Sequence, residues 1–154
     1  MMADAGHLTI LSGGQTGVDR AALDAAMERG MPCGGWCPAG RWAEDGPIDV
    51  RYPLRETPLA GPAQRTEWNV RDSDGTLLLT TSAASPGTEL TVEVAKRLGR
   101  PVYRWELDAP ADAEAFRGWL RAHKIGTLNV AGPRESESPG VHASACAYLR
   151  AVLP

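Results

Sequence analysis

Short apolar runs alternate along the chain with segments in which apolar residues recur every three or four positions. The first pattern indicates buried strands and the second indicates amphipathic helices. The strand-like segments are 7–12, 32–36, 76–80, 101–105 and 127–131. The helix-like segments are 16–30, 63–72, 86–98, 110–123 and a last one that opens at 138–140. Between them, residues 37–60 carry four prolines and no clear period, which predicts a long loop.

Strands that alternate with helices predict right-handed βαβ crossovers and a parallel sheet covered on both faces. We therefore expect an α/β protein, a three-layer Rossmann-like sandwich with about five strands, in which residues 1–154 form a single domain. The tripeptide Ser-Pro-Gly occurs at 85–87 and 138–140. Serine suits a helix N-cap and proline the first turn, so both copies predict helix starts that face the same edge of the sheet. Thr16 and Asp19 predict a capping box on the first helix.

Composition and charge narrow the class of protein. Apolar residues make up 43% of the 154 residues and charged residues 23%, which is typical of a globular protein. The net charge of −3 disfavours a general nucleic-acid binder. No apolar run reaches the length of a membrane span, and the first residues lack the features of a signal peptide. We therefore expect a cytoplasmic protein with no membrane partner.

The cysteines and histidines do not form a recognisable metal or disulfide pattern. The chain has three cysteines, and an odd number argues against a disulfide framework. Cys33 and Cys37 are spaced C-x3-C, which is neither a redox motif nor half of a standard zinc site. The three histidines are scattered. We expect small buried thiols and no metal held by the protein.

The glycine-rich turn after the first strand is the first candidate binding element. In an open parallel sheet, ligands bind beyond the carboxyl ends of the strands. Residues 12–20 read Ser-Gly-Gly-Gln-Thr-Gly-Val-Asp-Arg. Glycines allow close backbone approach, and the amides at a helix start attract anions. The turn is neither a Walker A motif nor a complete G-x-G-x-x-G, and no acidic residue follows the second strand, which disfavours an NAD site. A simple chain reversal is the alternative.

The other loops expected at this edge carry glycine together with arginine, hydroxyl or acidic residues. Arginine offers forked donors to phosphate or carboxylate oxygens. The candidate ligand- or phosphate-binding residues are Gly13, Gly14, Gln15, Thr16, Gly17, Asp19, Arg20, Arg41, Arg65, Gly87, Thr88, Gly132, Arg134, Glu135 and Ser136. Glu44, Asp45 and Glu89 are candidate catalytic carboxylates, and a helix cap or a salt bridge is the alternative role for each.

Five sequence blocks resemble the family called putative molybdenum carrier proteins, in order and in spacing. They are 12–20, 37–46, 65–76, 87–91 and 128–136. That family belongs to a Rossmann-like superfamily that includes the Lonely-guy phosphoribohydrolases and DNA-processing protein A. The resemblance implies a nucleotide-type ligand at the glycine loops, with the molybdenum cofactor as one candidate, and a homo-oligomer.

One loop differs from that of the Lonely-guy enzymes, which carry Pro-Gly-Gly-x-Gly-Thr-x-x-Glu. Residues 85–91 read Ser-Pro-Gly-Thr-Glu-Leu-Thr, so Thr91 stands where the catalytic glutamate would be. Glu89 lies two residues earlier, about 200° away around a helix.

Three hypotheses follow. The first is a carrier that holds a small phosphorylated, nucleotide-like ligand through glycine and arginine loops. The second is a nucleotide-processing hydrolase in which loop carboxylates, with Asp19 among them, converge on the bond to be cleaved. The third is an interaction domain in which Trp42 of the long loop anchors a partner or a second copy of the chain.

Overall fold

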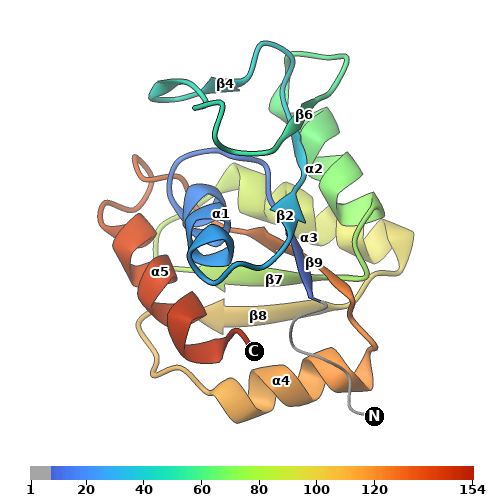
Figure 1. The fold of residues 1–154 in the computed structure, drawn as a ribbon, viewed down its shortest axis with the longest axis vertical. Helices are drawn as coiled ribbons and strands as arrows, with labels where there is room; N and C mark the ends of the chain where they lie inside the picture. Colours follow the sequence, from blue (N-terminus) through green and yellow to red (C-terminus); the bar gives the residue numbers. More distant parts are fainter. Residues whose placement is uncertain (1–7) are drawn as a thin grey trace.

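The crossovers place five parallel strands side by side between two layers of helices (Figure 1). The structure, a computed structural model, describes residues 8–154. Within them the sheet has the order β2-β1-β9-β7-β8, and all its pairings are parallel. Its strands are β1 (Thr9–Leu11), β2 (Cys33–Gly34), β7 (Gly75–Thr80), β8 (Val102–Glu106) and β9 (Thr127–Ala131). The predicted Rossmann-like α/β fold is confirmed; residue 7, at the start of the first predicted strand, lies outside the described part.

In the described part of the chain, five helices cover the two faces of this sheet. They are α1 (Val18–Glu28), α2 (Pro62–Arg71), α3 (Pro86–Leu98), α4 (Ala113–Ala122) and α5 (Val141–Val152). Apolar side chains of α1, α4 and α5 share one large core with the strands, whereas α2 and α3 pack together through Val70, Val94 and Ala95. The central strand β9 is the last in the sequence. It lies between β1 and β7 and is parallel to both, so the carboxyl ends of the three strands lie side by side.

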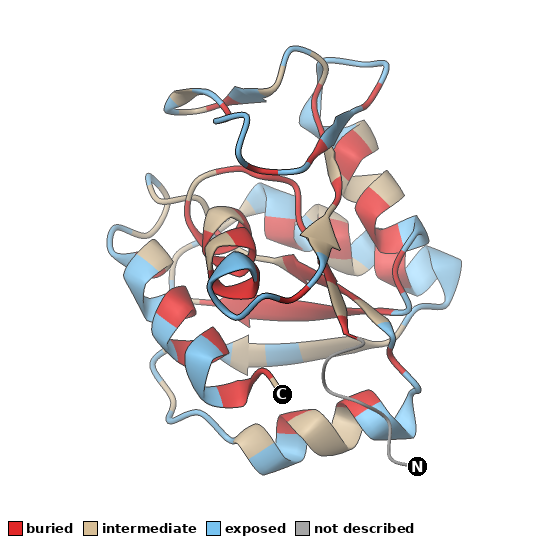
Figure 2. Ribbon diagram, viewed as in Figure 1, coloured by how far each residue is buried: buried red, intermediate tan, exposed pale blue. Residues whose placement is uncertain are grey.

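The two faces of the sheet differ in polarity. Side chains alternate between faces along a strand, and β7 is buried along its whole length (Figure 2). Leu77 and Leu79 join the large core, so Thr76 lies on the opposite face. There it pairs in register with Asn129, whose amide Nδ2 donates to the Thr76 hydroxyl at 3.2 Å. The face beneath α2 and α3 therefore carries buried polar groups.

The predicted capping box on the first helix is wrong. The N-cap of α1 is Gly17, and no side chain caps it. The Thr16 hydroxyl instead donates to the Glu44 carboxylate and accepts from the Glu135 N–H at 3.1 Å. Long-range partners from two other loops thus take the place of the local hydrogen bond that the pattern predicts.

The predicted second strand, 32–36, is split by Gly35. This residue has φ +131, and a Cβ on it would lie 2.2 Å from the Ser12 carbonyl oxygen. Only β2 joins the main sheet, while β3 (Trp36–Cys37) pairs with β6 (Arg55–Glu56). The Asn69 side chain of α2 fixes the backbone after this break, because it accepts from the Trp36 N–H and donates to the Trp36 carbonyl.

The predicted long loop, 37–60, contains short paired elements. These are the antiparallel pair β4 (Trp42–Ala43) and β5 (Gly46–Pro47), followed by β6. The Arg41 guanidinium donates to four backbone carbonyls, those of Ile48, Asp49, Tyr52 and Leu54. Arg41 therefore orders this segment from within, and its predicted contact with a ligand stays a prediction.

The other helix starts follow the sequence pattern in part. Ser85 is the N-cap of α3, as predicted, and Gly99 ends that helix in the left-handed conformation. At the second Ser-Pro-Gly, however, Gly140 is the N-cap of α5 with φ 90, so Ser138 and Pro139 lie in the turn before it. The helix predicted at 110–123 begins later, because Asp112 caps the Ala115 N–H at 3.0 Å.

We predict that Gly132→Ala lowers the free energy of unfolding by about 1–3 kcal/mol, a typical cost of overpacking. A Cβ at Gly132 would lie 2.4 Å from the Leu79 carbonyl oxygen and 2.6 Å from Val18 Cγ2. Gly118→Ala is the matched control, because this glycine lies in the interior of α4 and a Cβ added there would have no contact closer than 3.9 Å. It should raise stability by about 0.5–1 kcal/mol. Urea unfolding measures the change in the free energy of unfolding for both variants. Equal changes would contradict the packing argument.

Candidate functional site

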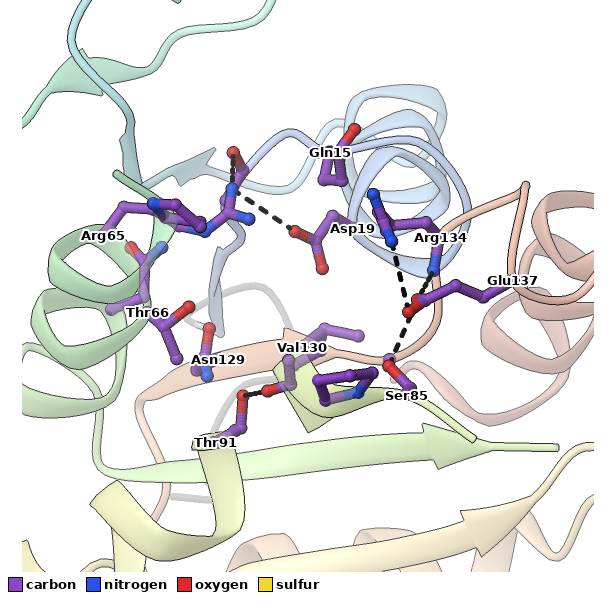
Figure 3. Close-up of a pocket in the computed structure, with 17 residues that line it drawn as sticks. Gln15, Asp19, Arg65, Thr66, Ser85, Thr91, Asn129, Val130, Arg134 and Glu137 are labelled. Atoms are coloured by element: carbon purple, nitrogen blue, oxygen red, sulfur yellow. Dashed lines mark hydrogen bonds and ion pairs between the residues drawn. The ribbon is translucent and has the colours of Figure 1, made fainter. Parts of the chain in front are cut away.

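A cavity of about 280 Å³ lies beyond the carboxyl ends of β1, β7 and β9 (Figure 3). The strand order reverses here along the chain, which is where open α/β sheets bind ligands. One wall comes from the turn after β1 and from α2, the other from the start of α3 and the loop after β9. Polar side chains on its walls are Gln15, Asp19, Arg65, Thr66, Asn69, Ser85, Thr91, Asn129, Arg134 and Glu137.

Arg65 and Asp19 face each other on the first wall. Each residue is only 9% exposed, and Arg65 Nη1 lies 4.0 Å from Asp19 Oδ2. The same Nη1 donates to the Gly13 carbonyl at 3.0 Å. No other hydrogen bond joins the Arg65 side chain to residues 8–154, so the rest of its forked donor set is unused on the cavity wall.

Burial raises the pKa of Asp19 to about 6. Arg65, the Gln15 backbone N–H and Arg20 oppose this shift, but they do not cancel it. A carboxyl group whose pKa lies near neutrality, in a cavity, is typical of functional sites. It costs stability, because its charged form is poorly solvated.

The opposite wall holds an internally satisfied carboxylate. Glu137 Oε1 accepts from the Arg134 N–H at 2.9 Å and from the Ser85 hydroxyl at 3.2 Å. Arg134 Nη2 lies 3.5 Å from Glu137 Oε2, and Arg134 Nη1 lies 3.5 Å from Glu44 Oε1. Through Glu137, this network joins the start of α3 to the loop after β9.

The structure brings some of the predicted residues together and separates others. Gly13, Gln15, Asp19, Arg65, Gly87, Gly132 and Arg134 line the cavity. The wall also contains residues that the sequence pattern did not single out: Thr66, Asn69, Ser85, Thr91, Asn129 and Glu137. Asn129 had a usable signal, since an amide inside an apolar strand needs a partner or a ligand.

A second, open hollow lies on the other side of the turn after β1. Its lining includes the predicted residues Thr16, Gly17, Arg20, Glu44, Asp45, Glu135 and Ser136. A hydrogen bond from Arg20 lowers the pKa of Asp45. Burial would raise the pKa of Glu44, but hydrogen bonds from Ser136 and Thr16 bring it below its usual range. Both carboxylates are therefore ionised structural partners at neutral pH.

Three further predicted residues lie elsewhere. Thr88 and Glu89 line a small hollow with Arg104, which adjoins the main cavity at Ser85, but neither residue lines the main cavity itself. Gly14 lines neither of the two larger hollows, and a Cβ on it would lie 2.5 Å from Leu54 Cδ1. The expected convergence of Asp19, Glu44, Asp45 and Glu89 is wrong: among these carboxylates, Asp19 alone lines the main cavity.

The cysteines are free thiols, with Cys37 and Cys146 buried and Cys33 partly so. Burial raises the pKa of all three, so they are weak nucleophiles at neutral pH. Within residues 8–154, no cluster of three or more His, Cys, Asp or Glu side chains is arranged to hold a metal ion. Over the same range, no helix is long and apolar enough to cross a bilayer.

The sequence profile of the circularly permutated YpsA SLOG family matches residues 10–153, almost the whole chain. The chain belongs to this family. A solved structure agrees: the crystal structure of a putative molybdenum carrier protein from Syntrophus aciditrophicus is 40% identical in sequence. It superimposes with a TM-score of 0.89 over 95% of this chain and 94% of that one. Among curated proteins, none matches the chain. The resemblance drawn from the five sequence blocks is thus confirmed.

We predict that Asp19 makes stability fall as the pH rises from about 4 to 6. Asp19 has its ordinary pKa of 3.8 in the unfolded chain and about 6 in the folded one. Between these values the folded protein holds a proton that the unfolded chain has released. The resulting loss is about 2–3 kcal/mol and persists above pH 6.

Asp19→Asn should lack this loss, measured relative to its own stability at pH 4. Urea unfolding at pH 4, 5, 6 and 7 tests the difference between the two pH profiles. Asp108→Asn, which removes an exposed carboxylate outside the cavity, should keep the wild-type profile. Parallel profiles for wild type and Asp19→Asn would contradict the assignment.

Proposed function

We propose that this SLOG protein binds a small phosphorylated ligand of mononucleotide size in the cavity above β1, β9 and β7. The unused donors of the buried Arg65 are the observation that carries the proposal. The spare Arg65 donors open onto the cavity and have no partner among residues 8–154, and planar forked donors match phosphate oxygens. An anion on the cavity wall would complete that pairing.

The size and the polar lining of the cavity support a compact ligand. Its volume lies just below the roughly 300–1,000 Å³ typical of ligand pockets. That suits a nucleoside monophosphate or a pterin phosphate better than a dinucleotide. The start of α3 adds a partial positive charge at Pro86 and Gly87, which favours the same kind of anion.

The molybdenum cofactor fits this proposal through its organic phosphate rather than through its metal. The cavity offers guanidinium, amide and hydroxyl groups, which are suited to oxyanions. Its carboxylates, Asp19 and Glu137, are partnered by Arg65 and Arg134. Residues of this chain would therefore hold such a cargo by its phosphate.

The homo-oligomer implied by the family resemblance stays a prediction. Large apolar side chains on the 37–60 segment support it, with Trp42 exposed to 52%, Val50 to 89% and Leu59 to 60%. This segment is also where the interaction-domain hypothesis would place a partner.

We predict that Arg65→Gln weakens the binding of the preferred nucleotide by about 10- to 100-fold, because a charge-assisted contact with the phosphate is lost. Calorimetry with AMP, GMP, CMP and UMP measures the loss. Arg121→Gln, an exposed arginine of α4 outside the cavity, is the matched control. Arg65→Lys keeps the charge without the fork and should fall between wild type and Arg65→Gln. If Arg65→Gln binds the nucleotide as tightly as wild type does, the ligand does not bind at Arg65.

The hydrolase hypothesis now depends on Asp19, because its raised pKa suits proton transfer and Glu89 lies outside the cavity. Thr91, at the place of the Lonely-guy glutamate, lines the cavity and donates to the Gly87 carbonyl at 3.0 Å. A hydroxyl tied to the helix backbone is a poor substitute for a carboxylate. We therefore expect bound nucleotide to be recovered intact after incubation with the protein. Chromatography for released base tests this, and base release by wild type that disappears in Asp19→Asn would favour the hydrolase instead.

A further inference from the structure

We propose that Asp19 makes this cavity select oxyanions that carry a proton, such as a phosphate monoester, over permanently deprotonated ones such as sulfate and molybdate. The inference rests on the proposed function, since it names the chemical class of the anion that Arg65 would hold. Its basis is the pairing of one buried donor with one buried acceptor on the same wall.

The two side chains are placed to contact the same anion. Arg65 Nη1 and Asp19 Oδ2 are 4.0 Å apart, and both residues are nine-tenths buried on the cavity wall. Figure 3 shows both side chains directed toward the space between α1 and α2. A tetrahedral oxyanion that accepts from the free donors of Arg65 therefore brings another of its oxygens to the Asp19 carboxylate.

That encounter is favourable only if a proton lies between the two oxygens. A carboxylate accepts hydrogen bonds and cannot donate one, so a fully deprotonated oxyanion meets it as charge against charge. A phosphate monoester has its second pKa near 6 and can keep one proton, which its P–O–H group donates to the Asp19 carboxylate. Sulfate and molybdate are fully deprotonated at neutral pH and have no proton to donate.

The charged surroundings of Asp19 leave it as the acceptor at pH 7.5. Burial raises the pKa of Asp19, but Arg65 of α2, the Gln15 N–H of the preceding turn and Arg20 of α1 oppose this and keep it at about 6, below pH 7.5. From the loop after β9, Arg134 and Glu137 line the same cavity and largely balance each other. The groups contributed by α3 and β9 are the uncharged Thr91 and Asn129. Binding should therefore take up about one proton at this pH.

The test compares wild type with Asp19→Asn, whose amide can donate to a deprotonated anion. The ligands are the tightest-binding of the four nucleoside monophosphates and the 5′-sulfate of the same nucleoside, with molybdate as a competitor. Calorimetry at pH 7.5 in buffers of different ionisation enthalpy gives both the affinity and the number of protons taken up. Asp108→Asn again serves as the matched carboxylate control.

Wild type should bind the phosphate with uptake of about one proton, and its affinity should fall by up to about tenfold per pH unit above pH 7. Asp19→Asn should bind the sulfate at least about tenfold more tightly than wild type does, and should lose the proton uptake. Molybdate should displace the nucleotide from Asp19→Asn but not from wild type.

Two results would overturn the inference and leave the proposed function standing. One is equal affinity of wild type and Asp19→Asn for the sulfate; the other is proton uptake that persists in Asp19→Asn. If none of the four nucleotides binds either protein, the proposed function fails, and the selection of anions fails with it.

Discussion

Gly17 brings the turn after β1 into backbone contact with the loop after β9. A Cβ on Gly17 would lie 2.3 Å from the Pro133 carbonyl oxygen, and that oxygen accepts the Val18 N–H at 3.1 Å. The contact fixes Asp19, in the first turn of α1, relative to the wall that carries Arg134. It also uses the first amide of α1 within the protein. That amide is therefore not free for an anion, whereas the Arg65 guanidinium makes a single hydrogen bond within residues 8–154 and keeps further donors.

The core of the fold was predictable because its determinants are local. Residues 76–80 contain three consecutive leucines, and β7 spans Gly75–Thr80; β9 spans the predicted 127–131. Prediction failed where contacts distant in the sequence override local pattern. Arg41 reaches up to 13 positions ahead to order its own loop, and Glu44 takes the hydroxyl that Thr16 would have used as a cap. Neither contact produces a periodic pattern in the sequence.

The site was predictable in outline for a similar reason. The rule that ligands bind at the carboxyl ends of parallel strands selected Gly13, Asp19 and Arg134 as wall residues. It does not say which way a side chain on a helix points. Glu89 follows the correct strand, yet it turns away from the cavity, whereas Thr91 two residues later lines it. Glu137 was missed because its role arises from the Ser85 hydroxyl, 52 positions earlier in the chain.

The four charges of the cavity are not equivalent. Glu137 is satisfied by Arg134 and Ser85, so that pair serves the architecture of the wall. Arg65 and Asp19 are both deeply buried, but their closest approach is 4.0 Å, too long for a direct hydrogen bond. A pair that existed only for stability would close to contact, because separated buried charges lose solvation without regaining it. The gap is intelligible if a third group belongs between them. Under the proposed function, one forked donor beside one acceptor favours an anion that can also donate a hydrogen bond.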